Sequence, residues 1–212
     1  MNKEEIQRLD NMLKYENEAY DNGYLHVCGV DEAGRGPLCG PVVAAAVILD
    51  KNAHLEGVND SKKLSEKKRE KIFDEIMQNA VAVGIGISDV EVIEEINILN
   101  ATKEAMKEAI SNLSIKPDFV LIDGNQNINI DIDRKTVISG DALSESIAAA
   151  SIVAKVTRDR MLREYDKEYP EYGFAKHKGY GTKMHIEAIK KYGLTPIHRP
   201  SFCTKFTSKQ LT

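Results

Sequence analysis

The chain has 212 residues, 42% hydrophobic and 29% charged, with a formal net charge of −4, which fits one well-packed domain with at most a small appendage. No stretch approaches the roughly 18 uncharged apolar residues of a membrane span, and the acidic start MNKEEIQRLD argues against a secretory signal. The cysteines, Cys28, Cys39 and Cys203, form no CxxC pair, and we interpret them as reduced thiols of a cytoplasmic protein.

The first part of the chain predicts a helix followed by two strands. Apolar residues recur with a helical period over Lys3–Asn22, and short apolar runs predict strands over Leu25–Val30 and Val42–Leu49. The second strand is apolar throughout, so we expect it at the centre of a sheet. The link between the two strands, Gly-Pro-Leu-Cys-Gly-Pro, is short and predicts an antiparallel pair.

Helices and strands alternate in the rest of the chain. After a loop over 50–64, we expect Ser65 to cap a helix that ends near Asn79. The sequence Ser-Asp-Val-Glu at 88–91 matches a capping box that opens a helical region, and Pro117 ends that region. The other expected elements are strands over Val81–Ile87, Asp118–Ile122 and Lys135–Ile138, a long alanine-rich helix after Gly140-Asp141 to about Tyr169, and a helix over Thr182–Tyr192. From Gly193 onward we expect loop or a short helix.

This order of elements predicts an α/β fold with a mixed sheet and helices on its faces. We treat residues 1–212 as one domain, with 170–212 as a small C-terminal helical or loop extension. If the first and fourth strands are parallel neighbours, their carboxyl ends lie at one edge of the sheet. Open α/β sheets bind their ligands at that edge.

The charge is unevenly distributed along the chain. From Lys155 to the end there are 13 Lys and Arg against 6 Asp and Glu, whereas the preceding residues are strongly acidic. A basic C-terminal third on an acidic body can bind a polyanion locally. Surface helices also carry Lys and Arg without binding anything, so charge alone leaves both interpretations open.

Acidic residues follow three of the predicted strands. Asp31 and Glu32 follow the first strand, Asp123 follows the strand that ends at Ile122, and Asp141 opens the alanine-rich helix. Carboxylates gathered in one place repel one another unless a cation lies between them. Oxygen ligands suit Mg²⁺ or Mn²⁺, and two such ions about 4 Å apart support phosphodiester hydrolysis.

Parts of this acidic pattern also have ordinary explanations. Asp141 is equally well explained as a helix cap, and acids at strand ends are common in turns. Adjacent side chains of a regular strand point to opposite faces, so Asp31 and Glu32 can both reach one metal only if the strand bends. Gly34 and Gly36 follow directly and would permit such a bend.

Five motifs, in order along the chain, carry a family resemblance. They are VDEAGRGPLCGPVVAAAVIL, NDSKKLS, IDG, GDALSESIAAASIVAKVTRDR and HKGYGTKMH. With them the chain closely resembles bacterial ribonuclease HII from Val30 to Phe202. The resemblance implies a ribonuclease H-like fold: a central mixed five-stranded sheet, flanking helices and a C-terminal helical extension. It also implies endonucleolytic cleavage of RNA in RNA/DNA hybrids and incision 5′ to single ribonucleotides in duplex DNA, which leaves 3′-hydroxyl and 5′-phosphate ends.

The same resemblance implies the catalytic residues and the cofactor. Its acidic quartet falls on Asp31, Glu32, Asp123 and Asp141, as catalytic residues and as ligands of Mn²⁺ or Mg²⁺. We expect Asp31 and Asp123 to hold the first ion, and the other two acids to complete a two-metal site once substrate is bound. The implied partners are RNA/DNA hybrids and ribonucleotide-containing duplex DNA, bound by a cytoplasmic monomer with no membrane contact.

The family's substrate-reading residues fall on two glycine-flanked segments. The turn Gly34-Arg35-Gly36 matches its ribose-sensing loop, and glycines let backbone groups approach a 2′-hydroxyl closely. Tyr180 resembles the tyrosine that stacks on the sugar of the next deoxynucleotide. Further candidates for phosphate contacts are Lys62, Lys178, Lys183 and Arg199, although a solvated surface charge is the ordinary explanation for each lysine.

Three rival interpretations are weaker. Ribonuclease HIII shares the fold and the acids, but it would carry an extra N-terminal DNA-binding domain, and only about 30 residues precede Asp31. A non-catalytic hybrid-binding module would be favoured by the loss of one of the four acids, and all four are present. A generic magnesium-dependent phosphatase needs neither a basic C-terminal third nor a ribose-reading loop.

Overall fold

The computed structural model describes residues 1–51 and 54–207. Its strands are β1 (Val27–Ala33), β2 (Val42–Ile48), β3 (Ala82–Ser88), β4 (Phe119–Asp123) and β5 (Asp133–Val137). Its helices are α1 (Lys3–Met12), α2 (Lys14–Asp21), η1 (Ser61–Lys63), α3 (Glu66–Asn79), α4 (Val90–Ser111), α5 (Gly140–Leu143), α6 (Glu145–Glu168), α7 (Phe174–His177), α8 (Lys183–Tyr192) and α9 (Pro200–Thr207). None of the described helices is long and apolar enough to cross a membrane.

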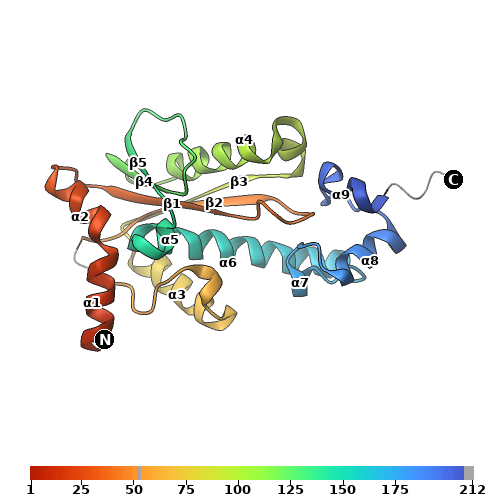
Figure 1. The fold of residues 1–212 in the computed structure, drawn as a ribbon, viewed down its shortest axis with the longest axis horizontal. Helices are drawn as coiled ribbons and strands as arrows, with labels where there is room; N and C mark the ends of the chain where they lie inside the picture. The colour runs from red at the N-terminus through yellow and green to blue at the C-terminus, as the bar shows by residue number, and fades with distance from the viewer. Residues whose placement is uncertain (52–53, 208–212) are drawn as a thin grey trace.

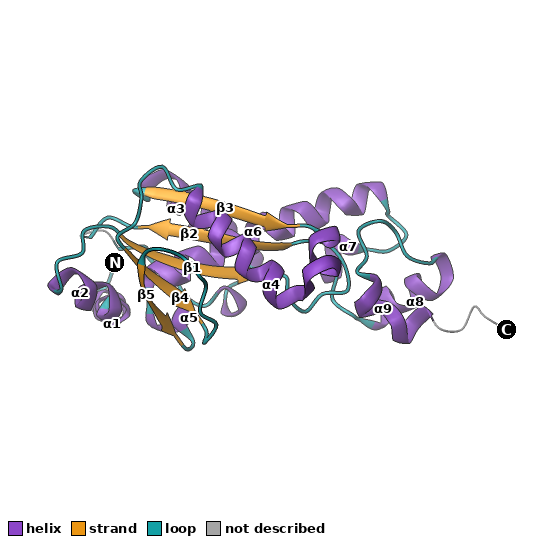
Figure 2. Ribbon diagram, turned by 90° about the horizontal axis from the view of Figure 1, so that it is seen from above, coloured by secondary structure: helices purple, strands orange, loops and turns teal. Residues whose placement is uncertain are grey.

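The strands form one mixed sheet in the order β3-β2-β1-β4-β5 (Figure 2). β1 pairs antiparallel with β2 and parallel with β4, and β5 continues the parallel half. These pairings confirm the predicted mixed sheet, the antiparallel first pair and the parallel alignment of the first and fourth strands. β2 is buried along its whole length, as its apolar sequence predicts for a central strand.

Helices cover both faces of the sheet (Figure 1). α6 lies along one face, where its run of small residues lets it approach closely: a Cβ on Gly29 of β1 would lie 2.1 Å from the backbone of Ser146. α4 covers the other face, and Ala105 and Ala109 pack there beside glycines of β3. Two apolar clusters result, one on each side of β1 and β2. They fix the position of the strands that carry the acids.

Several predicted boundaries are wrong in informative ways. The N-terminal helix is two helices, because Leu13 leaves the helical conformation between α1 and α2. The cap of α4 is Asp89, whose side chain accepts from the Val92 amide, while the Ser88 hydroxyl donates to the Ala101 carbonyl. The alanine-rich helix begins only at Glu145, capped by Ser144, so the preceding residues form the separate short helix α5.

The C-terminal helices α7, α8 and α9 lie at the opposite end of the molecule from α1 and α2 (Figure 1). They share an apolar cluster with Leu38 and Cys39 of the β1–β2 connection and Leu162 of α6. His185 and His198 are buried in this cluster, with their Nε2 atoms 3.1 Å apart, and burial lowers the pKa of each to about 4. The packing places the extension directly against the glycine-rich turn that follows β1. The division into a domain and an extension at residue 170 stays a prediction.

Candidate active site

β1 carries Asp31 and Glu32 inside the strand, not beyond its end. The ladder with β2 continues through Asp31–Ala45, Glu32–Ala44 and Ala33–Val43. The predicted bend is therefore wrong, and the two carboxylates leave opposite faces of a regular strand. Asp31 faces the α6 side, whereas Glu32 also lines a small cavity with Thr102 and Met106 of α4.

The end of β4 allows acids from both faces to meet. The register pairs Val30 of β1 with Ile122 of β4, so Asp31 and Asp123 are the next residues along two adjacent parallel strands. β4 ends at Asp123, and among the described residues its pairing with β1 stops before Glu32. Asp123 Oδ1 accepts a 2.7 Å hydrogen bond from the amide of Gly140, and this bond brings α5 and Asp141 to the same edge.

The electrostatics of the four acids show that they act on one another. Burial raises the pKa of Asp31 well above its usual range, and the charges of Glu32 and Asp123 raise it further. Burial also raises the pKa of Glu32, and the Arg35 guanidinium opposes that rise. Burial raises the pKa of Asp141 as well, with Asp60 and Asp123 adding to the effect. Such mutual repulsion is expected where cations bind.

One cavity joins the acids to the predicted substrate-reading residues. It has a volume of about 220 Å³ and is lined by Asp31, Glu32, Gly34, Arg35, Gly36, Lys62, Tyr180 and residues of α6. The Arg35 Nη1 atom lies 3.4 Å from Glu32 Oε1, and the Lys62 Nζ atom lies 3.9 Å from Asp141 Oδ2. Five residues predicted to contact nucleic acid therefore meet two of the predicted acids in one place.

The two glycines of the turn after β1 serve different purposes. Gly34 is buried at φ +101°, and a Cβ there would lie 2.1 Å from Nε of the buried Arg158, so the fold itself requires glycine. Gly36 is exposed, and a Cβ there would meet only a Tyr180 ring carbon at 3.9 Å. No internal contact explains Gly36, and its missing side chain leaves the cavity open towards Tyr180.

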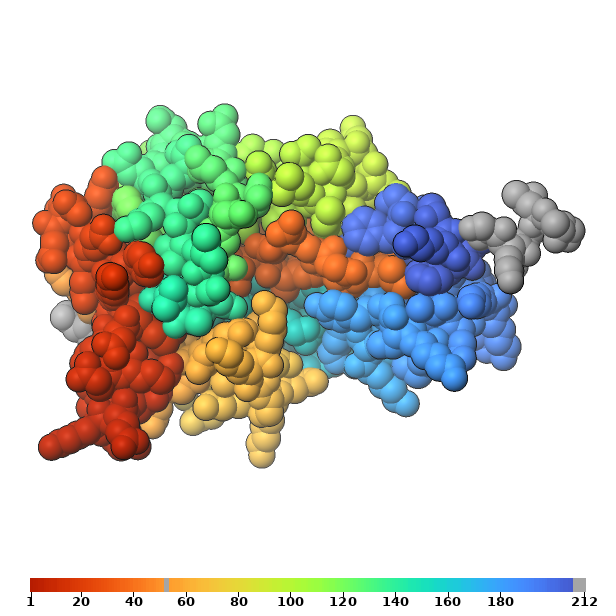
Figure 3. Space-filling view, in the orientation of Figure 1, coloured from red at the N-terminus to blue at the C-terminus, as the bar shows by residue number. Residues whose placement is uncertain are grey.

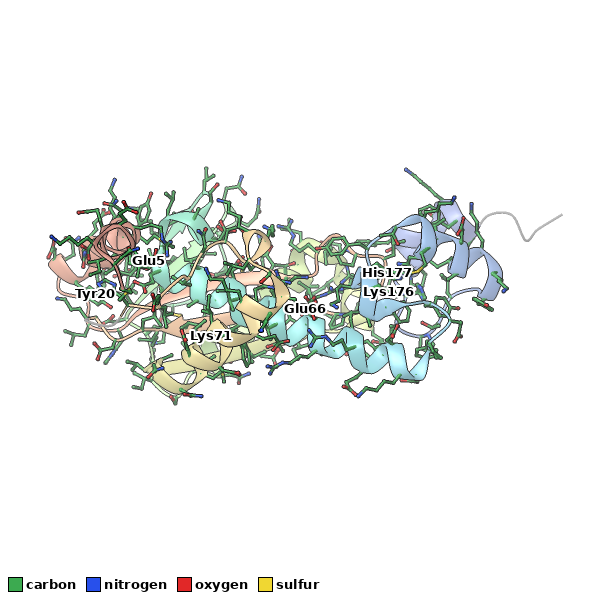
Figure 4. All side chains as sticks on the ribbon, turned by 90° about the horizontal axis from the view of Figure 1, so that it is seen from below. Glu5, Tyr20, Glu66, Lys71, Lys176 and His177 are labelled. Atoms are coloured by element: carbon green, nitrogen blue, oxygen red, sulfur yellow. The ribbon has the colours of Figure 1, made fainter. Side chains whose placement is uncertain are left out.

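Three of the predicted phosphate contacts lie outside this cavity, and one of them is wrong. Arg199 is completely buried and donates only to backbone carbonyls, so it cannot reach a phosphate. The Lys178 ammonium is largely covered, donates to the Ala175 carbonyl and lies 3.8 Å from Glu66, which Figure 4 shows at the end of α3 nearest Lys176 and His177. Lys183 is exposed, 3.8 Å from Glu187, and its phosphate contact stays a prediction.

Sequence reasoning also missed two residues of this site, Ser151 and Arg158 of α6, which line the cavity. Lys155 of the same helix lines it too and forms an ion pair with Asp159, one helical turn away, at 2.8 Å. Arg158 gave no comparable signal, since its partners lie 20 to 119 residues away in sequence.

The chemistry of the acids fits a divalent cation. The donor set near the cavity consists of carboxylate oxygens, with Asp31 and Asp141 themselves buried, and hard divalent ions prefer this combination. Among the residues that the structure describes, no three acidic, His or Cys side chains lie close enough together to hold one metal ion.

A five-stranded mixed sheet with this strand order and an acidic edge at β1 and β4 defines the class: a ribonuclease H-like α/β protein. The family model for ribonuclease HII matches residues 28–205. Ribonuclease HII of Acetivibrio thermocellus is 61% identical over 202 residues, which are 95% of this chain and 79% of that protein. The chain therefore belongs to the ribonuclease HII family, and its activity is that of this family of metal-dependent ribonucleases H.

Solved structures agree with this assignment. Ribonuclease H2 from Pyrococcus horikoshii OT3 superposes with a TM-score of 0.74 at 29% identity, covering 87% of this chain and 98% of that one. The ribonuclease HII of the PCNA:RNase HII complex from Archaeoglobus fulgidus gives 0.72 at 28% identity, with 82% and 94% covered. Bst-RNase HIII in complex with Mn²⁺ gives 0.60 at 18% identity, covers 65% of that chain, and shares the fold.

Proposed function

We propose that this enzyme incises duplex DNA on the 5′ side of single embedded ribonucleotides and cleaves the RNA strand of RNA/DNA hybrids. The observation that carries the proposal is the shared cavity, in which buried acids and the exposed turn Arg35-Gly36 face Tyr180. A nuclease for any RNA would need the acids alone. A nuclease that selects a ribonucleotide followed by a deoxynucleotide needs a second reading element beside them, and the position of Tyr180 in the same cavity supports this role.

The turn after β1 is proposed to read the ribose. Only a contact to the 2′-hydroxyl, which both donates and accepts hydrogen bonds, distinguishes RNA from DNA at a given position. The absent side chain of Gly36 leaves backbone groups of the turn accessible from the cavity. The side chain of Arg35 is 46% exposed, and its planar guanidinium can hold the adjacent phosphate.

Tyr180 is proposed to read the following sugar. Its side chain is exposed and lines the cavity that holds Asp31 and Glu32, and a Cβ on Gly36 would lie 3.9 Å from its ring. A flat ring at this distance can stack on a deoxyribose, whereas a 2′-hydroxyl would crowd it. The two elements together would select the junction between one ribonucleotide and DNA.

The four acids are proposed to position the scissile phosphate through divalent cations, Mn²⁺ or Mg²⁺. When bound, two such ions activate water and stabilise the leaving oxygen. Asp31 and Asp123, adjacent across β1 and β4, would hold the first ion, and Glu32 and Asp141 would complete the site from the other face and from α5. Lys62, exposed and near Asp141, would contact the phosphate backbone and orient the strand.

A cytoplasmic location is part of this proposal. Cys28, Cys39 and Cys203 are all unpaired and buried, as expected for a protein kept in a reducing compartment.

The test is a cleavage assay on labelled duplex DNA with one internal ribonucleotide, beside an all-DNA duplex and a long RNA/DNA hybrid. We expect a cut 5′ to the ribonucleotide, no cut in all-DNA, and a loss of about tenfold on the single-ribonucleotide substrate in Tyr180→Ala, with a smaller loss on the hybrid. Tyr192→Ala, at another exposed tyrosine, is the matched control. Equal losses on both substrates in Tyr180→Ala would remove the role given to this ring.

A further inference from the structure

The ribose-reading turn is held from inside by one buried arginine, Arg199. Its Nε donates to the Gly40 carbonyl at 2.9 Å, and its Nη1 donates to Arg35 and Pro37 at 3.1 and 2.9 Å. Its Nη2 donates to Gly34 and Gly40, each at 2.7 Å. A guanidinium has five N–H groups, so every donor of Arg199 is used on the backbone of residues 34–40.

A second buried arginine, Arg158 of α6, ties the β1–β2 connection, which begins with this turn, to the segment that carries Tyr180. Its Nε donates to the Pro41 carbonyl and its Nη2 to the Cys39 carbonyl, each at 2.9 Å. Its Nη1 donates to the Lys178 carbonyl at 2.9 Å, two residues before Tyr180. A further bond runs from the Leu38 amide to the Gly179 carbonyl. The two reading elements are therefore joined through one side chain and one backbone bond.

Both guanidinium groups are buried, and neither forms an ion pair with a carboxylate in the part of the chain that the structure describes. Burial and the nearby charge of Arg158 lower the pKa of Arg199 to about 10. Burying a charge is costly unless its hydrogen bonds are all made, so an arginine that served only to fill space would be replaced at lower cost by an apolar side chain. The arrangement has a different consequence, which is to fix the positions of the carbonyls it binds. In Figure 3 the orange surface that includes the β1–β2 connection lies next to the blue surface of the C-terminal helices.

We propose that Arg199 and Arg158 are positioning residues for substrate selection: Arg199 fixes the shape of the ribose-reading turn, and Arg158 fixes the distance between that turn and Tyr180. This inference rests on the proposed function of the turn and of Tyr180. Lysine cannot replace either residue, because an ammonium offers three donors from one point and cannot span carbonyls that lie around a planar fork. A displacement of the turn by about 1 Å would separate it from the 2′-hydroxyl. Misplacements of this size lower the rate of catalysis strongly.

The test compares Arg199→Lys and Arg158→Lys with the wild type and with Arg163→Lys, a matched control on α6 whose guanidinium pairs with Glu66 and Glu70 outside the site. The substrates are a duplex with one ribonucleotide, the same duplex with a 2′-fluoro nucleotide at that position, and a long hybrid. We expect Arg199→Lys to lower the ratio of ribonucleotide to 2′-fluoro cleavage about tenfold. We expect Arg158→Lys to lower the ratio of single-ribonucleotide to hybrid cleavage about threefold, and Arg163→Lys to change neither ratio.

These ratios separate positioning from stability, because a variant that merely unfolds in part loses rate on all substrates equally. Folded variants that keep both wild-type ratios would overturn the proposal. If the wild type itself does not prefer the ribonucleotide over 2′-fluoro, the proposed reading of ribose fails instead.

If Arg199→Lys does not fold, the variant Phe202→Leu tests the role of Arg199 in its place. It removes the ring whose centroid lies 5.2 Å from the Arg199 guanidinium and leaves every N–H donor of Arg199 in place. A drop of about threefold in the first ratio supports the proposal, and an unchanged ratio contradicts it.

Discussion

The acidic edge of the sheet and the turn beside it are both built on buried like charges, but they are satisfied to different degrees. Arg158 and Arg199 spend their N–H groups on backbone carbonyls, and the turn they hold is complete without a ligand. Asp31 and Asp141 are also buried, and burial raises the pKa of each carboxyl. Neighbouring acids, among them Asp123 for both, raise these pKa values further. The two arginines are hydrogen-bonded within the fold, whereas neighbouring acids raise the pKa of Asp31 and Asp141, for which we propose cations as partners.

The largest expected effect tests the acidic side of this comparison. Asp31→Asn should lower cleavage of both substrates by more than about 1000-fold, because the amide cannot replace a carboxylate that holds a cation. It should not lower the melting temperature in EDTA, since it removes one of several charges that repel one another. Steady-state kinetics and thermal unfolding measure the two effects, with the exposed Asp131→Asn as control. A large loss of stability in EDTA would show that Asp31 is satisfied within the fold, as the arginines are.

The second prediction separates structure from reading within the turn. Gly34→Ala should destabilise the protein by about 3 kcal/mol, because its backbone is left-handed and its Cβ would strike Arg158. Gly36→Ala should leave stability nearly unchanged and lower single-ribonucleotide cleavage by about tenfold, because its methyl group would enter the open side of the cavity. Urea unfolding and the cleavage assay together check both. Near-native cleavage by Gly36→Ala would mean that the ribose does not approach the turn there.

These two glycines also show where sequence reasoning stops. The strands, their mixed sheet and the acids at its edge follow from apolar runs and from residue types at strand ends, which are local signals. The local rule failed at Asp31 and Glu32, because the two residues lie inside a continuous ladder with β2 and not at a bend. Arg199 was predicted to contact a phosphate. Its actual acceptors lie about 160 residues earlier, and no local sequence pattern indicates contacts at that separation. Gly34 and Gly36 look equivalent in the sequence and differ only in what packs against them.

The smallest expected effect concerns a buried acid outside the active site, Glu16 of α2. Its Oε1 accepts from the hydroxyls of Ser144 and Ser146 and from the Ser146 amide, while its Oε2 has no partner among the described residues. Burial raises the pKa of Glu16 despite these bonds. Ser144 directly follows α5, which carries Asp141, so Glu16 anchors the residue next to the helix that carries one of the four acids.

A raised pKa in the folded state fixes the sign of the pH dependence. The folded protein binds the Glu16 proton more tightly than the unfolded chain, so this contribution to stability is complete below the ordinary carboxyl pKa and is lost as the pH rises through the folded value. Glu16→Gln removes that titration. Between pH 5 and pH 8, the unfolding free energy of the variant should therefore rise relative to that of the wild type. Glu18→Gln on the same helix is the control: Lys135 lowers the pKa of Glu18, so Glu18 titrates below this pH window and its variant should show no such rise. If Glu16→Gln rises no more than Glu18→Gln, the pKa of Glu16 is not raised in the folded protein.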